Sequence, residues 1–230
     1  MTKSVFLTLL LSIQIACSSS WPAPLDKSQS SSVSDLDKLR KQVERFAVGE
    51  GNEKVYLQLE QLPRNNLISD LDKLKGQAAE DDSIRVKIAF LFCRLDYHYE
   101  ENREIIARSL TRNSPYYKLP PDETIGFASN MIKRGDKQLL AVVMTASEWA
   151  DGALGEGIED ILYKVVMNDL DSILRNLVNL PLPIRQAVYR EIKFALTEAK
   201  DKSKIKSQLK SKYGDKVLSN VAKEMLRAIT

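Results

Sequence analysis

The chain has 230 residues, of which 43% are hydrophobic and 28% charged, and this is enough apolar mass for a substantial core. Nine glycines and eight prolines are few for this length, and such sparse turn residues disfavour collagen-like, disordered and short-stranded all-β chains. The 34 basic and 31 acidic side chains leave a net charge of only +3, so overall charge gives no reason to expect nucleic acid as a partner. Two cysteines exclude a disulfide framework, and a single histidine excludes a His-rich zinc site.

The N-terminal segment has the pattern of an export signal. Lys3 supplies a positive charge, and twelve uncharged residues, 5–16 (VFLTLLLSIQIA), follow it. A bilayer-spanning helix needs about 20 apolar residues, so this run is too short for a permanent anchor. It predicts a secretory signal peptide over residues 1–16. A buried first helix is the alternative, but the polar stretch 18–34 could not connect such a helix closely to a core.

A cysteine follows the apolar run directly. Residues 13–17 (IQIAC) resemble the lipobox of bacterial lipoproteins, in which a small residue precedes the modified cysteine; Gln14 stands where that family usually has leucine or another aliphatic residue. The resemblance implies acylation of Cys17, and each buried CH₂ of an acyl chain would contribute ~0.8 kcal/mol to membrane attachment. Ordinary signal-peptidase cleavage, with Ala16 and Ser18 as the small residues, is the alternative and would leave a soluble secreted or periplasmic protein.

The next segment and the remainder of the chain differ in composition. Residues 17–33 are rich in serine and contain Pro22 and Pro24, so they cannot bury apolar surface and are expected to form a flexible tether. From residue 34 to 230, apolar residues recur at steps of three and four. This period predicts one all-α domain, built as an irregular helix-pair stack or as a compact helical bundle.

Turn residues and capping side chains divide this domain into twelve helices. Two of them, 82–96 and the one containing 139–144 (LLAVVM), are apolar on most sides and are expected at the centre of the fold. The expected helices span about 34–48, 53–61, 66–74, 82–96, 102–113, 122–134, 136–149, 158–167, 169–180, 183–199, 203–213 and 215–228.

Two short repeats suggest stacked helix pairs. Residues 34–39 and 69–74 both read SDLDKL, a displacement of 35 residues, which lies in the range of helix-pair solenoids. The pattern LxxLP occurs at 59–63 and again at 177–181, each time where one helix is expected to end before another begins. No third copy keeps the 35-residue step, and the tetratricopeptide signature is absent. By its helix arrangement, the body resembles a degenerate HEAT-type α-α stack.

The residues that usually carry catalysis are few. Cys93 lies in an apolar helix and is expected to be a small buried hydrophobe rather than a reactive thiol. His98 lies in the segment DYHYEE with no nucleophile motif elsewhere to serve, so a polar-aromatic corner is expected. The segment 151–157 (DGALGEG) matches no dinucleotide loop, Walker loop or EF-hand and is expected to be a flexible corner. We therefore predict no catalytic residue, cofactor or metal site.

One candidate partner contact lies beside this glycine-rich segment. Glu148, Trp149 and Asp151 are placed at an expected helix end, and tryptophan among charged groups is typical of an interface anchor. The same tryptophan would serve equally as a wedge that covers the core.

A lysine-rich run forms the strongest local charge feature. Residues 200–212 contain six lysines and one acid, and Lys202, Lys204, Lys206 and Lys210 are the candidates for contact with an anionic surface: lipid headgroups, an envelope polymer or nucleic acid. Ile205, Leu209 and Tyr213 recur at four-residue spacing within it, which instead favours a packed helix with lysines on its outer face.

These patterns together favour a non-enzymatic helical protein of the bacterial cell envelope, held at the membrane by a lipid on Cys17. Stacked helix pairs expose extended ridges, so we expect it to act as a scaffold for an envelope protein. A hydrolase or lytic enzyme with a site assembled from distant residues is one alternative, and an inhibitor or immunity-type lipoprotein is another. The sequence specifies neither the partner nor the oligomeric state.

Overall fold

The computed structural model describes residues 33–45, 59, 61–79, 82–112 and 121–230, and all regular structure among them is helical. The all-α prediction is confirmed. Residues 1–32, which include the predicted signal peptide, Cys17 and nearly all of the tether, lie outside the described residues, as does most of the helix expected at 53–61. The elements are α1 (Val33–Arg45), α3 (Arg64–Gln77), α4 (Ser83–Arg94), α5 (Tyr99–Ser109), α6 (Pro121–Lys133), α7 (Lys137–Ala146), α8 (Gly152–Asn168), α9 (Leu170–Asn179), α10 (Leu182–Ala195), α11 (Ala199–Ser211), the 3₁₀ turn η2 (Lys212–Gly214) and α12 (Ser219–Ile229).

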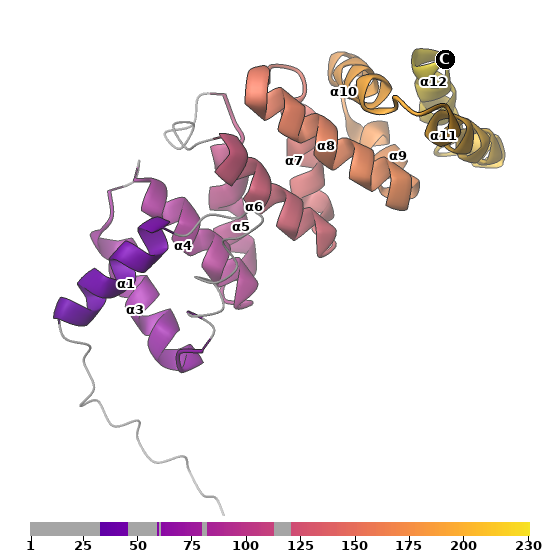
Figure 1. Ribbon diagram of the computed structural model, residues 1–230. Helices are drawn as coiled ribbons and strands as arrows, with labels where there is room; N and C mark the ends of the chain where they lie inside the picture. The colour runs from indigo at the N-terminus through magenta and orange to yellow at the C-terminus, as the bar shows by residue number, and fades with distance from the viewer. Residues whose placement is uncertain (1–32, 46–58, 60, 80–81, 113–120) are drawn as a thin grey trace, which may run out of the picture.

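The helices pack mainly against near neighbours in the chain. The most extensive contacts join α4 to α5, α6 to α8, α8 to α10, and α12 to both α10 and α11. Figure 1 shows the result as an elongated stack, with α1 and α3 at one end and α11 and α12 at the other. A single cluster of buried apolar side chains runs through all of it. The architecture is therefore a helix-pair stack.

Two helices are central, as their apolar sequences predict. In α4, nine consecutive or near-consecutive residues are buried, and Phe90 stacks on Phe127 of α6 with ring centroids 4.6 Å apart. In α7, Leu139, Leu140 and Val143 are buried. A helix surrounded on most sides by other helices needs apolar residues around its circumference, which is the pattern that both segments have.

Three aspartates fix the starts of helices by capping them. Asp82 accepts from the N–H of Ile84 at 3.0 Å, Asp136 accepts from the N–H of Leu139 at 2.9 Å, and Asp169 accepts from the N–H of Ser172 at 3.1 Å. Each carboxylate satisfies a backbone donor that has no partner within its helix. The predicted boundaries are accurate at these three positions for that reason.

The two LxxLP segments adopt the same junction. The N–H of the second leucine donates to the carbonyl of the first, at 3.1 Å for residues 62 and 59 and at 3.2 Å for residues 180 and 177. Pro63 and Pro181 then stand at the N-cap of α3 and α10. The longer SDLDKL repeat has no such equivalence, because its first copy lies at the start of α1 and its second in the middle of α3.

The glycine-rich segment is helical, so the prediction of a flexible corner there was wrong. Helix α8 begins at Gly152 and includes Gly155 and Gly157. A Cβ on Gly157 would lie 2.7 Å from Cγ1 of Ile125 in α6. The glycine is therefore explained by the close approach of two helices rather than by a turn, and only the tertiary packing reveals this.

Candidate functional site

A shallow hollow of about 280 Å³ lies between α8 and α10. Its lining comprises Glu156, Glu159, Asp160 and Tyr163 from α8, together with Ala195 from α10. These four positions of α8 are spaced by three or four residues, so they share one face of the helix. The opposite face buries Ile158, Ile161, Leu162 and Val166 in the core, which turns the acidic face outward.

The hollow concentrates negative charge. Partial burial raises the pKa of the Glu159 carboxyl, and the neighbouring carboxylates of Glu191 and Glu156 raise it further. Asp160 pairs with Lys164 at 2.5 Å, and Glu191 pairs with Arg190 at 2.9 Å. Glu156 and Glu159 have no cation within ion-pair distance among the described residues, so the hollow favours an incoming positive group.

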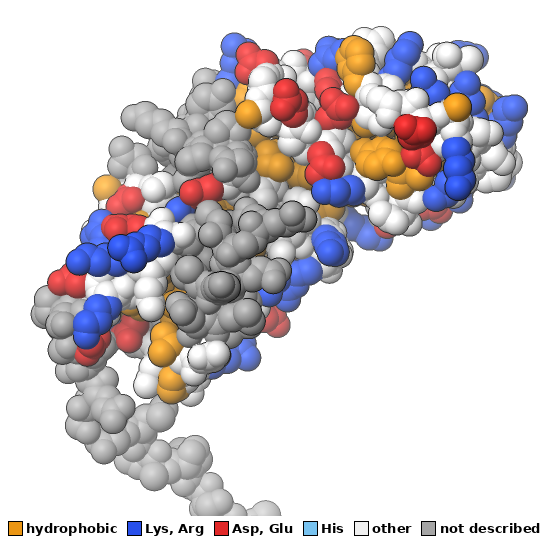
Figure 2. Space-filling model, viewed as in Figure 1, with side chains coloured by type: hydrophobic (Ala, Val, Ile, Leu, Met, Phe, Trp, Pro, Cys, Tyr) orange, Lys and Arg blue, Asp and Glu red, His pale blue; other side chains and the backbone are white. Residues whose placement is uncertain are grey.

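Aromatic and apolar groups adjoin these carboxylates. The Tyr163 hydroxyl donates to Asp201 of α11 at 2.8 Å, which holds the ring in place and ties α11 to α8. Phe194, next to Ala195 on α10, is 61% exposed. Figure 2 shows acidic and hydrophobic side chains close to one another on this part of the molecule. A hollow of carboxylates, with an exposed aromatic residue next in sequence to its lining residue Ala195, is suited to binding a partner that is apolar and basic.

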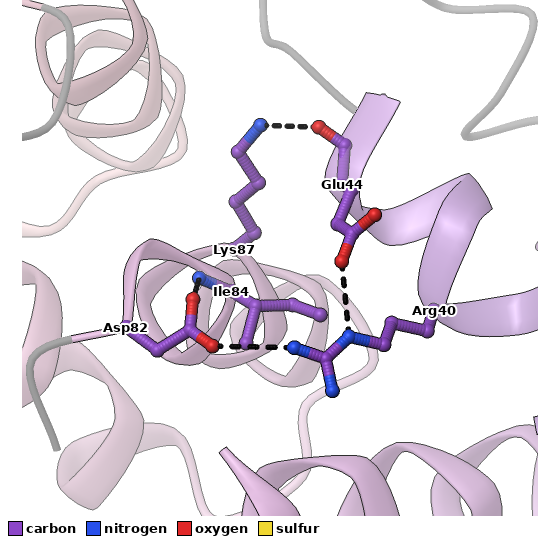
Figure 3. Close-up of polar contacts among 5 residues, drawn as sticks. All are labelled: Arg40, Glu44, Asp82, Ile84 and Lys87. Carbon is purple, nitrogen blue, oxygen red and sulfur yellow. Dashed lines mark hydrogen bonds and ion pairs between the residues drawn. The ribbon is translucent and has the colours of Figure 1, made fainter. Parts of the chain in front are cut away.

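A second polar cluster joins the N-terminal helices, and Lys87 is its buried member. Nζ of Lys87 in α4 lies 2.8 Å from the backbone oxygen of Glu44 in α1 and 3.1 Å from the carboxylate of Glu123 in α6. Arg40 bridges the carboxylates of Glu44 and Asp82, at 3.0 and 3.5 Å (Figure 3). Because Lys87 is enclosed and engaged on two sides, this cluster positions helices and offers no accessible nucleophile.

The predicted contact at residues 148–151 is divided between core and surface. Trp149 is half-buried and packs against the core, whereas Glu148 and Asp151 are exposed. The interpretation of Trp149 as a wedge is therefore the one that the packing supports. None of the three residues lines the hollow between α8 and α10.

The lysine-rich run is a packed helix, α11, with Ile205 and Leu209 fully buried as predicted. Tyr213 does not continue the buried stripe, because the chain turns into η2 at Lys212 and leaves its ring exposed. The predicted lysines also separate: Lys204 donates to the backbone oxygen of Met167 at 3.2 Å on the side that faces α8. Lys202, Lys206 and Lys210 follow one another at four-residue spacing along the other flank.

Cys93 and His98 have the environments that the sequence predicts. Cys93 is buried, its Sγ lies 3.6 Å from the backbone oxygen of Tyr99, and desolvation together with the nearby Asp136 raises the pKa of its thiol to about 12. His98 is exposed at the N-cap of α5 with φ of 45°, and its ring meets Tyr97 edge-on at 4.4 Å. Neither arrangement activates a nucleophile or a base.

The acidic hollow was missed at the sequence level, although a signal for it exists. Glu156, Glu159, Asp160 and Tyr163 have helical spacing, but the predicted helix began only at 158, which removed the first acid from the face. Among the described residues, no three His, Cys, Asp or Glu side chains are grouped so as to hold a metal ion. None of the described helices is long and apolar enough to cross a membrane.

Comparison with known proteins gives no family. No protein-family model matches the chain, and no curated protein or solved structure is significantly similar to it.

Proposed function

We propose that the chain is a non-enzymatic scaffold of the bacterial cell envelope that binds another protein on the surface between α8 and α10. In this proposal residues 1–16 direct export, Cys17 carries the lipid that holds the protein at the membrane, and residues 17–33 let the helical stack stand clear of it. The stack supplies an extended rigid surface on which a partner could be held.

One observation carries the proposal: α10 leaves Phe194 61% exposed, and the residue next to it, Ala195, lines a hollow that also has three carboxylates. Exposing Phe194 gains nothing for folding, whereas binding hot spots are enriched in aromatic residues that fill a partner's pocket. The carboxylates of Glu156 and Glu159 would select a partner with Lys or Arg around that pocket, and this charge complementarity would also speed association.

The test is photo-crosslinking in the cell of origin, with a benzophenone amino acid at position 194. We expect one discrete adduct, and we expect it to disappear when Glu156 and Glu159 are both changed to lysine. Leu182 is a matched control, because it is also exposed and lies in the same helix. Equal crosslinking from positions 194 and 182, or an adduct that is indifferent to the charge reversal, would refute the assignment of this surface.

A hydrolase is the second candidate because the pKa of Glu159 is raised, and a raised pKa suits a carboxyl to general-acid chemistry. This alternative predicts turnover of an envelope polymer such as peptidoglycan, lost in Glu159→Gln but retained in Phe194→Ser. The scaffold proposal instead predicts that partner binding is lost in Phe194→Ser and that neither variant shows turnover. The two proposals are therefore separated by the same pair of substitutions.

A further inference from the structure

The C-terminal end of the stack is strongly cationic. Residues 199–230 contain nine Lys or Arg and three Asp or Glu, a net charge of +6 in a chain whose total is +3. The remaining residues, 1–198, are therefore net negative. Figure 2 shows Lys and Arg side chains gathered over this end of the molecule, where α11 and α12 lie.

All three acids of this segment are used inside the fold. Glu224 pairs with Arg185 of α10 at 3.0 Å and also accepts from the Tyr189 hydroxyl at 3.1 Å. Asp201 accepts from Tyr163, and Asp215 accepts from the N–H groups of residues 217 and 218 at 2.8 and 3.0 Å, in the turn that leads into α12. Each of these carboxylates is thus bonded to a neighbouring helix or to the turn before α12, and none forms an ion pair with Lys206, Lys210 or Lys216.

Most of the lysines, by contrast, remain available. Lys212 is engaged, since it pairs with Asp171 of α9 at 2.7 Å, and Lys204 is bonded to α8. Lys206, Lys210 and Lys216 have no carboxylate within ion-pair distance among the described residues of the protein. This outer surface is thus a concentration of unneutralised positive charge.

Two apolar side chains are exposed at this end of the stack. Val217 is 61% exposed and Tyr213 is 38% exposed, both at the connection between α11 and α12. Nζ of Lys223, on α12, lies 5.4 Å from the centre of the Tyr213 ring, which places a cation of α12 beside this connection. We call Lys206, Lys210, Tyr213, Lys216, Val217 and Lys223 the C-terminal cationic surface.

We propose that the C-terminal cationic surface docks on an anionic phospholipid bilayer, with the lysines at the headgroups and Val217 in the interface below them. Lysines next to a leaflet of anionic lipid bind it electrostatically, and an exposed aliphatic side chain beside them gains burial in the same contact. A tyrosine is also suited to this depth, because its ring is apolar and its hydroxyl remains hydrated.

The composition of the surface favours lipid over nucleic acid. Eight of the nine cations in residues 199–230 are lysines, whereas bidentate recognition of phosphates is a property of the arginine guanidinium. An exposed valine has no counterpart on a phosphate backbone, but it matches the acyl boundary of a bilayer. Nucleic acid is accordingly the competing outcome of the test.

The first experiment reports on the position of Val217 itself. In the full chain with Cys17→Ser, an environment-sensitive dye is attached at Val217→Cys, and the control carries the dye at Phe194→Cys, which is equally exposed. Cys93 is buried and does not compete for the label. With vesicles of about one part phosphatidylglycerol to two parts phosphatidylcholine, we expect a blue shift at 217 and none at 194, and no shift at either with phosphatidylcholine alone. Equal responses at the two positions, or a response to the neutral vesicles, would overturn the proposal.

The second experiment tests the lysines with the dye at 217 as the readout. Changing Lys206, Lys210 and Lys216 to glutamine should raise the lipid concentration at half-response by about 100-fold, at roughly fivefold for each lysine. The matched control changes the exposed Lys41, Lys133 and Lys193 to glutamine. The lipid concentration at half-response should then stay within about twofold of the unchanged chain, since these residues lie elsewhere on the stack. Similar values for the two triple variants would overturn the proposal.

A competition arm separates lipid from nucleic acid. At about 0.15 M salt, a short DNA duplex should not displace the labelled chain from the anionic vesicles. Displacement by the duplex at a lower phosphate concentration than that of the vesicles would instead assign the surface to nucleic acid. The proposal is independent of the partner-binding surface on α8 and α10, since the two depend on different residues.

Discussion

Replacing Gly157 with alanine should destabilise the protein, whereas the same change at Gly155, one half-turn earlier in α8, should not. A Cβ on Gly157 would lie 2.7 and 2.8 Å from the two γ-carbons of Ile125, well inside carbon–carbon contact. Ile125 is β-branched and held in α6, so it has little freedom to rotate away. At Gly155 the nearest atom would be the backbone oxygen of Ala150 at 3.5 Å, an ordinary contact.

The two variants are expected to differ in their free energy of unfolding only through this overlap. Both gain the helix propensity of alanine over glycine, about 0.8–1.0 kcal/mol in a helix interior. Only Gly157→Ala also suffers overpacking, which costs about 1–3 kcal/mol when helices must separate or a side chain must leave its rotamer. We therefore expect the free energy of unfolding of Gly157→Ala to be about 1–3 kcal/mol below that of Gly155→Ala.

Equilibrium unfolding in urea, monitored by helical circular dichroism, measures this difference directly. Combining Gly157→Ala with Ile125→Ala should recover part of the loss, because the shortened side chain removes both overlapping γ-carbons. If Gly157→Ala is as stable as Gly155→Ala, the close approach of α6 and α8 is refuted, and with it the explanation of the glycine-rich segment.

Three further results are expected. Glu123→Gln should cost about 3 kcal/mol of unfolding free energy, because it leaves Lys87 as a buried cation with one partner. The double change of Lys87→Met with Glu123→Leu should be close to neutral in the same urea assay. Equal losses in the single and the double variant would contradict this. Alkylation of Cys93 at pH 8 should be far slower in the folded than in the unfolded chain, because the raised pKa of about 12 leaves almost no thiolate, and comparable rates would show the site to be open. Asp169→Ala should cost about 1 kcal/mol at pH 7. The hydroxyl and N–H of Ser172 lower the pKa of the Asp169 carboxyl, so the capping contribution is complete above the ordinary pKa of aspartate and is lost as pH falls through the lower folded-state value. A stability difference between the two chains that does not shrink as the pH is lowered, in pH-dependent thermal melts, would contradict this origin.

The local sequence specified most of the helices, because their determinants are local. Asp82, Asp136 and Asp169 cap helices within three residues of themselves, and the periodic leucines and isoleucines define which face is buried. The largely apolar circumference of α4 was enough to place it at the centre, and Cys93 with it. These features depend on spacing along one chain segment, which the sequence displays directly.

Other features depend on contacts between segments far apart in the chain, and only the tertiary structure decided them. The glycines of 152–157 read locally as helix-breaking, yet Gly157 is required by an isoleucine that lies thirty-two residues earlier. The lysine run contains one acid, so its sequence does not show which lysines have partners. Lys204 and Lys212 are engaged because Met167 of α8 and Asp171 of α9 lie next to them in the fold. The acidic hollow exists because α8 turns one face outward beside α10. Helix periodicity specifies which side chains share a face, but the surfaces available for binding are those that the neighbouring helices leave uncovered.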